Sequence, residues 1–496
     1  MTVNPKVNPK KLRPYDEPPK RRRSLIPSAP DSATGAFMVG AALWLALATA
    51  LGALATLMRI VPFELSFGLG VFDLSFQFDQ SRVELAFVNA VVYGWLSNAA
   101  FALVTFTTPR LVGKRLAAEA GIFIAFLIWN LSALGGLGAL YVFEPGPNSP
   151  LTAFPWFIDG GLATAALIVT GGFLATVGTA VRTAYVTTWF AGVALLAILG
   201  LTSLSATMGL VDFLIGLSDV TVGLGSAFID RAVILLWLLP MAYAGLYYLV
   251  PRATGQPLES IGLAFLAWLT WLVPAPLAAL SVVVDTQVPV VVTSAGAAAA
   301  IVLIVPTALT VVNLVLTTRG RWSLLFGTGP VAFAAVAAAF LLATGLLTAI
   351  AALPSVREHV GGTDWAAGAF TWATLGAFTL AALAFFEHAL PRALRREWGA
   401  TPLSAATLWT IFGGTTIAGL ALMGAGLAQG AFRAQGADPE TIAAGVVGYE
   451  LAALAGFGLL AIGGVAVLAN QFLAYTSGAP ATYAVAGQPA SAAAGH

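Results

Sequence analysis

Side chains that could bind a metal ion or a heme iron are scarce in this sequence. It contains no cysteine and only three histidines, His359, His388 and His496. The absence of cysteine excludes disulfides, thiolate metal sites and covalent attachment of a c-type heme. None of the histidines lies in the middle of an apolar segment, and the methionines are too scattered to form a pair across an iron. We therefore interpret His359 and His388 as solvated or interfacial residues.

A few ionisable residues lie inside long apolar segments or at their ends. Asp230 and Arg231 open one such segment, and Glu450 lies within another. Ionisable groups inside a bilayer are costly and are therefore candidates for a functional role. Asp230 and Arg231 could pair with each other or with groups on neighbouring helices. For each of the three residues, anchoring of a helix at the membrane interface is the alternative interpretation, and we assign no proton channel.

The composition indicates a membrane protein. Apolar residues make up 59% of the chain and charged residues 9%, whereas soluble domains carry about 25% charged residues. Runs of about 20 residues or more lack any charged side chain, and this length crosses a hydrocarbon core as a helix. The lipid bilayer is therefore an expected partner, and no motif indicates binding to nucleic acid.

Twelve apolar segments predict twelve transmembrane helices. A bilayer leaves no backbone group unpaired, and these segments lack the alternation of polar and apolar residues that barrel strands show, so helices are favoured. The predicted fold class is an all-α integral membrane protein. The expected spans are residues 36–60, 84–107, 118–144, 157–180, 186–208, 228–250, 258–281, 290–317, 327–352, 364–390, 404–430 and 443–473.

The basic residues predict the direction of these helices. With a cytoplasmic N-terminus, the N-terminal tail and the loops on its side hold 18 of the 23 Lys and Arg residues, which is the positive-inside bias. An even number of spans then places both termini in the cytoplasm. We expect a disordered tail over 1–35, a membrane domain over 36–476 and a flexible tail over 477–496.

Short motifs, in their order along the chain, carry a resemblance to a known family. In this order and at these distances, they resemble subunit I of the cbb-type (C-family) heme-copper cytochrome c oxidases, over spans two to twelve. The motifs are Asn89–Trp95 (NAVVYGW), Phe154–Asp159 (FPWFID), Tyr185–Phe190 (YVTTWF), Trp237–Pro240 (WLLP), Tyr247–Arg252 (YYLVPR), Gly255–Ser260 (GQPLES), Asn313–Thr317 (NLVLT), Thr363–Trp365 (TDW), Leu390–Arg392 (LPR), Gln429–Gly430 and Asn470.

The resemblance implies where metal ligands would lie. The family carries two hemes and one copper, bound by six histidines, and has a redox-active tyrosine beside the copper. None of these seven residues is kept in this chain. The heme-ligand positions correspond to Phe87, Ala369 and Thr371, the copper-ligand positions to Arg231, Ala275 and Pro276, and the tyrosine position to Leu269.

The residue types at these positions do not suit iron or copper. Heme iron needs an imidazole, thiolate, thioether or phenolate, and the side chains of Phe87, Ala275, Pro276 and Ala369 donate no electron pair. Arg231 stays protonated and would repel copper. We therefore predict a bundle like that of oxidase subunit I with a degenerate active site and no heme or copper of its own.

The volume that two hemes would occupy has to be filled in another way, because large cavities destabilise a packed protein. Aromatic side chains are expected to fill it. The candidates are Trp237, Trp268, Trp271, Phe370 and Trp372. For each of them, ordinary packing between helices or contact with lipid is the alternative interpretation.

Three functions are open. The favoured one is a non-catalytic scaffold or docking subunit of a respiratory electron-transfer complex, whose redox centres lie on partners such as membrane-anchored c-type cytochromes or an oxidase core. The alternatives are a catalytic cytochrome c oxidase subunit with unusual ligation, and an ion or solute transporter that reuses the fold. The resemblance implies the inner (plasma) membrane of a bacterial or archaeal cell.

Overall fold

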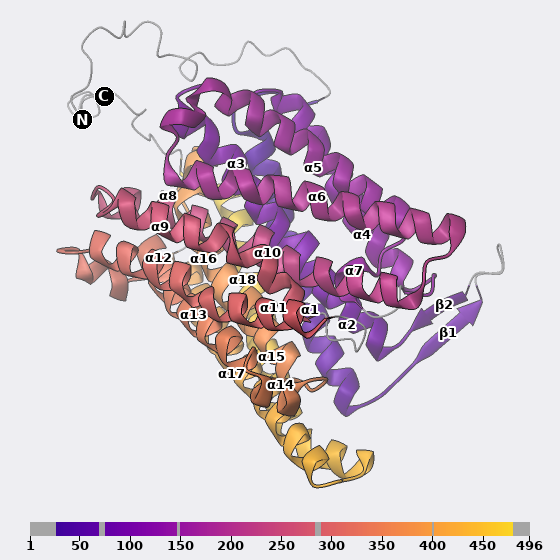
Figure 1. Cartoon of the computed structure of the whole chain (residues 1–496). Helices are drawn as coiled ribbons and strands as arrows, with labels where there is room; N and C mark the ends of the chain where they lie inside the picture. The colour runs from indigo at the N-terminus through magenta and orange to yellow at the C-terminus, as the bar shows by residue number, and fades with distance from the viewer. Residues whose placement is uncertain (1–25, 69–74, 146–148, 283–288, 399–400, 480–496) are drawn as a thin grey trace, which may run out of the picture.

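The computed structural model describes residues 26–68, 75–145, 149–282, 289–398 and 401–479. Within these residues, twelve helical segments are long and apolar enough to cross a membrane, which confirms the predicted number of spans and the all-α fold class (Figure 1). Most of the two expected tails, 1–35 and 477–496, lies outside the described residues. The segments consist of α1 (Ser32–Ile60); α2 (Gln80–Asn89), η2 (Ala90–Leu96) and α3 (Ser97–Val112); α4 (Glu119–Leu140); α5 (Trp156–Val177); α6 (Val186–Ile215); α7 (Asp219–Ala232), η5 (Val233–Leu238) and α8 (Leu239–Thr254); α9 (Ile261–Leu272) and α10 (Pro274–Ala279); α11 (Val290–Val302) and α12 (Ile304–Thr317); α13 (Pro330–Ala351); α15 (Trp365–Thr371), η8 (Trp372–Phe378) and α16 (Thr379–Leu394); α17 (Thr401–Ala434); and α18 (Pro439–Ser477).

Short elements lie at the ends of the spans. An antiparallel ribbon follows α1, and Phe76 and Phe78 of its second strand stack on Tyr141 at the end of α4. The aromatic stack therefore holds the ribbon against the bundle. These elements are β1 (Leu65–Gly68), β2 (Ser75–Phe78), η3 (Pro150–Thr152), η4 (Gly178–Thr183), η6 (Leu280–Val282), η7 (Trp322–Phe326) and α14 (Pro354–Val360).

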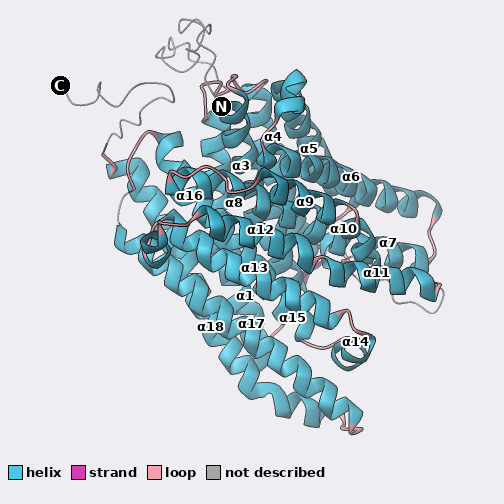
Figure 2. Ribbon diagram, turned by 60° about the vertical axis from the view of Figure 1, so that its left-hand side comes forward, coloured by secondary structure: helices cyan, strands magenta, loops and turns pink. Residues whose placement is uncertain are grey.

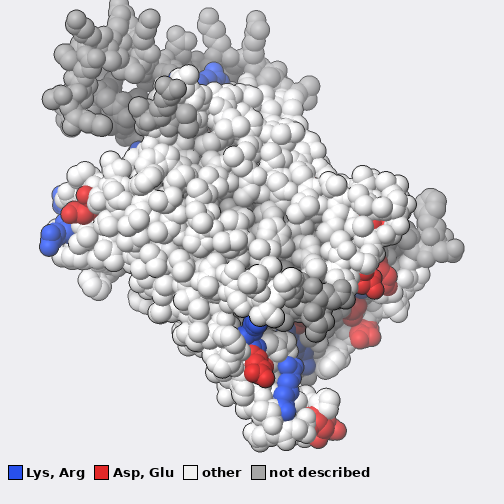
Figure 3. Space-filling model, in the orientation of Figure 1, with Lys and Arg blue, Asp and Glu red and all other residues white. Residues whose placement is uncertain are grey.

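Charged side chains avoid the middle of the bundle surface. In Figure 3 the face toward the viewer is almost free of charge, and the blue and red side chains lie near its edges, where the helices end. The helices α17 and α18 form a long hairpin that projects beyond the ends of the neighbouring helices (Figure 2). This distribution fits a bundle whose apolar girdle faces lipid.

Spans two, six and ten are the most buried of the twelve, and each contains a π-helical stretch: η2, η5 or η8. The apolar pattern that predicts the spans does not predict these stretches. In span six, Pro240 follows η5 closely. Because proline donates no hydrogen bond and its ring displaces the carbonyl four residues earlier, it gives a physical reason for the wider turn.

Two hydroxyl groups join the three π-helical stretches. Ser97 donates to the carbonyl of Val92 in η2 and accepts from Trp237 Nε1 of η5, at 2.8 and 2.9 Å. Thr379 donates to the carbonyl of Thr374 in η8 and accepts from Trp95 Nε1 of η2, at 2.8 and 2.7 Å. All these groups are buried, so each hydroxyl satisfies a carbonyl on its own helix and an indole on the next.

Replacing Thr379 by valine should lower the free energy of unfolding by about 1–3 kcal/mol, because Trp95 Nε1 would be left buried without an acceptor. The measurement is the midpoint of thermal unfolding in detergent. Thr164→Val is the matched control, since the exposed Thr164 hydroxyl bonds only to Gly160 of its own helix. Equal midpoints for the two variants would contradict this role of Thr379.

Candidate functional site

The helices of the core enclose two cavities near the predicted ligand positions. The large cavity measures about 810 Å³ and lies between α7, η5, α11 to α15 and η8. Arg231 and Ala369 both line it. The structure therefore brings together one predicted copper-ligand position and one predicted heme-ligand position from spans six and ten.

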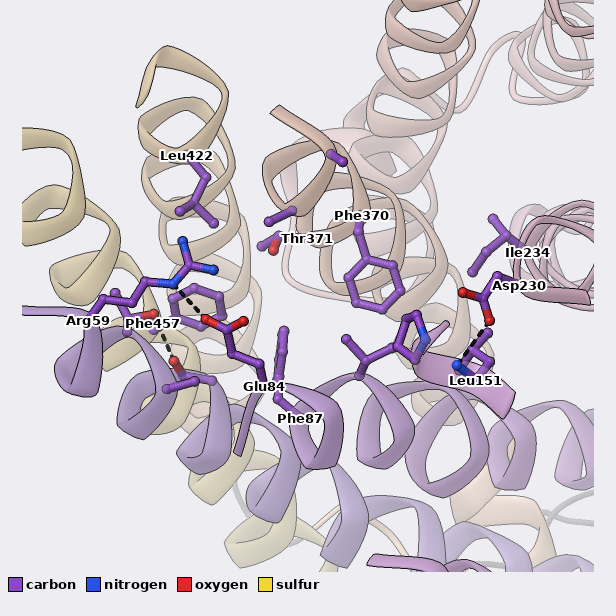
Figure 4. Close-up of a pocket in the computed structure, with 17 residues that line it drawn as sticks. Arg59, Glu84, Phe87, Leu151, Asp230, Ile234, Phe370, Thr371, Leu422 and Phe457 are labelled. Carbon is purple, nitrogen blue, oxygen red and sulfur yellow. Dashed lines mark hydrogen bonds and ion pairs between the residues drawn. The ribbon is translucent and has the colours of Figure 1, made fainter. Parts of the chain in front are cut away.

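The small cavity measures about 280 Å³ and lies between α1, α2, η3 and α15 (Figure 4). Phe87 and Thr371, the other two predicted heme-ligand positions, both line it. The ring of Phe87 packs edge-on against those of Phe370 and Phe457, with centroids 6.2 and 5.5 Å apart. The cavity is therefore narrowed by aromatic rings from three different spans.

The remaining predicted ligand positions lie elsewhere in span seven. Leu269 is 43% exposed on α9, Ala275 is buried on α10, and Pro276 is half-buried. None of the three lines either cavity. The structure thus brings four of the seven positions to two cavities and leaves the span-seven positions outside both.

Of the five aromatic residues expected to fill the heme volume, four line neither cavity. Only Phe370 lines a cavity, and it lines both. Trp271 donates to the carbonyl of Leu235, and Trp372 packs against Phe340. Trp237 is bonded to Ser97 as described above, and Trp268 packs against Trp189. These four indoles pack between neighbouring helices and leave the two cavities open.

A charged cluster closes one end of the small cavity. Arg59 on α1 pairs through Nε with Glu84 on α2 and through Nη1 with Asp364, each at 2.7 Å. Gln429 on α17 donates to the second oxygen of Asp364 at 2.7 Å. Four separate segments therefore meet in one ion-pair network. The second predicted span, 84–107, begins at Glu84, and Gln429 belongs to one of the motifs, but the sequence did not predict this network.

Asp230 and Arg231 do not pair with each other. Asp230 lines the small cavity and accepts a hydrogen bond from the backbone N–H of Leu151 at 2.9 Å. Arg231 lines the large cavity, and its buried Nε has no hydrogen-bond partner among the described residues. Glu450 is half-buried on α18 and lines neither cavity. The two adjacent charged residues thus line different cavities.

The side chains around the cavities do not fit heme iron or copper. Among the described residues that line them, none is a histidine, cysteine, methionine or tyrosine. No group of three or more His, Cys, Asp or Glu residues suited to a metal ion occurs in the described part of the chain. His359 is exposed on α14. His388 is buried beside Tyr248 near the end of α16, so of the two expected interpretations the solvated one is wrong, and His388 lines neither cavity.

The twelve-helix bundle, with cavities between its buried spans, defines a polytopic membrane protein with the fold of a heme-copper oxidase core subunit. The chain belongs to the family of cytochrome c and quinol oxidase polypeptide I, whose profile matches residues 32–480. A heme-copper terminal oxidase dimer solved by cryo-EM has a similar fold, with a TM-score of 0.72 and 16% sequence identity over 92% of this chain and 86% of that one. No curated protein matches the sequence.

Replacing Arg59 by glutamine should lower the free energy of unfolding by about 2 kcal/mol, because Glu84 and Asp364 would lose their partner in a partly buried site. Thermal unfolding in detergent measures the change. Arg433→Gln is the control, since exposed Arg433 bonds only to the carbonyls of Gly361 and Gly362. A control variant that loses as much stability as Arg59→Gln would refute the importance of the network.

Proposed function

We propose that this chain is a subunit I-like membrane subunit without its own heme or copper, most similar to the cbb-type. It would act as a scaffold or docking subunit of a respiratory electron-transfer complex. One observation carries the proposal. Four predicted ligand positions line the two cavities, and they hold Phe87, Thr371, Arg231 and Ala369, none of which is a family ligand.

The chemistry of Arg231 supports the proposal most directly. A guanidinium keeps its proton and offers only donors, so it cannot replace an imidazole on copper. Its positive charge also disfavours a cation in the same space. A change from histidine to arginine therefore removes a ligand and adds a repulsive charge.

The partners of such a subunit would carry the redox centres. Membrane-anchored c-type cytochromes or an oxidase core are the proposed partners, since the chain has no cysteine for covalent heme attachment. The excess of basic residues on one side supports a cytoplasmic location for both termini, and the resemblance to oxidase subunit I supports the inner membrane of a bacterial or archaeal cell. A catalytic oxidase with unusual ligation is the alternative that the first experiment tests.

The purified chain should show no Soret absorption, and iron and copper should each be far below one atom per chain. The reason is that the cavity linings offer no strong axial donor. Absorption spectroscopy and elemental analysis make the measurement, with an active heme-copper oxidase purified in the same way as the control. Stoichiometric heme that remains bound through purification would contradict the proposal and favour a catalytic oxidase subunit with unusual ligation.

The tagged chain should co-purify with heme proteins from membranes dissolved in a mild detergent. A subunit that lacks redox centres gains a respiratory role only through such partners. Heme staining of the eluate and mass spectrometry identify them, with an unrelated tagged membrane protein as the control. A monodisperse chain that elutes without any respiratory subunit would count against a docking role.

A further inference from the structure

Three polar side-chain atoms in the large cavity are buried without a hydrogen-bond partner among the described residues. They are Arg231 Nε of α7, Thr344 Oγ1 of α13 and Trp365 Nε1 of α15. Buried polar groups are nearly always satisfied in native proteins, and each exception calls for an explanation. Here three exceptions from separate helices line the same space.

Three other hydroxyl groups in the lining donate to carbonyls of their own segments. Thr307 donates to the carbonyl of Leu303, Thr374 to that of Phe370, and Ser281 to that of Ala278. The unsatisfied atoms are therefore not a general property of the cavity wall. An indole and a guanidinium can only donate, so a molecule that satisfies them must supply acceptor oxygens.

The charge of the cavity indicates an anion. No described carboxylate forms an ion pair with Arg231. Asp230 lines the small cavity instead, and Glu358 is exposed at the end of the large cavity near α14. A buried guanidinium without a partner is costly, and an anionic ligand would offset that cost.

The size and the wall of the cavity indicate that the anion has a long apolar part. Its volume of about 810 Å³ lies in the range of sites for organic ligands, about 300–1,000 Å³. Most of the lining is aliphatic or aromatic, as at Leu235, Leu303, Leu341 and Phe378. An inorganic anion would leave most of this wall without contacts.

We propose that the large cavity binds a long-chain carboxylic acid, such as a fatty acid from the membrane. The carboxylate would accept hydrogen bonds from Arg231 and Trp365, and the alkyl chain would lie along the apolar wall. This site goes beyond the scaffold function and does not depend on the identity of any partner chain.

The test is equilibrium binding of radiolabelled palmitate to the delipidated full chain in detergent. We expect saturable binding that methyl palmitate competes for weakly, because the ester carries no charge. Arg231→Gln should weaken palmitate binding by about tenfold or more, as expected for loss of a charged hydrogen bond. Trp365→Phe keeps an aromatic ring but loses the donor, and it should weaken binding less.

The matched control is Arg321→Gln, because Arg321 is exposed beyond the opposite end of α13. Elution volume and thermal midpoint establish that each variant is folded. Equal affinity of the wild type and Arg231→Gln, or equal affinity for palmitate and its methyl ester, would overturn the proposal. The palmitate proposal would also be overturned if porphyrin co-purified with the wild-type chain but not with the Arg231→Gln variant. Failed palmitate binding without a Soret band would leave the scaffold proposal standing.

Discussion

The structure depends on keeping polar groups satisfied where widened helices meet in an apolar core. A π-helical turn changes which N–H each carbonyl receives, and no water in a bilayer core can compensate. Ser97 and Thr379 meet this constraint because a hydroxyl both donates and accepts. Each bonds to a carbonyl of its own helix and to an indole of the next. The three most buried spans are thus held in one relative position, and both cavities lie beside them.

The fold was largely predictable from the sequence because a bilayer imposes simple rules. Length, hydropathy and the asymmetry of basic residues predicted twelve helical spans, and the described part of the chain contains twelve. The π-helical stretches were not predictable, since no periodicity marks the extra residue. Pro240 was a signal for one of them, but a proline in a membrane helix predicts a kink and not its geometry.

The candidate site was predictable only in part. The predicted ligand positions in spans two, six and ten line the cavities, because those helices form the centre of the bundle. The open volume was not foreseen, because aromatic side chains were expected to fill it, whereas Trp271 contacts Leu235, Trp372 contacts Phe340, and neither lines a cavity. The role of Arg59 was also missed. Its partners Glu84 and Asp364 are distant in sequence, and only the packed helices bring them together.

The two cavities differ in how their charges are balanced. Beside the small cavity, Arg59 faces two carboxylates, and Asp230 is stabilised by a backbone N–H. In the large cavity, no carboxylate of the described residues forms an ion pair with Arg231, and its Nε has no hydrogen-bond partner among them. Electrostatic interactions are strong where water is excluded, so an unpaired guanidinium there favours binding of an acceptor. The small cavity is satisfied by its own protein groups, whereas the large one is complete only with an acceptor that the described chain does not provide.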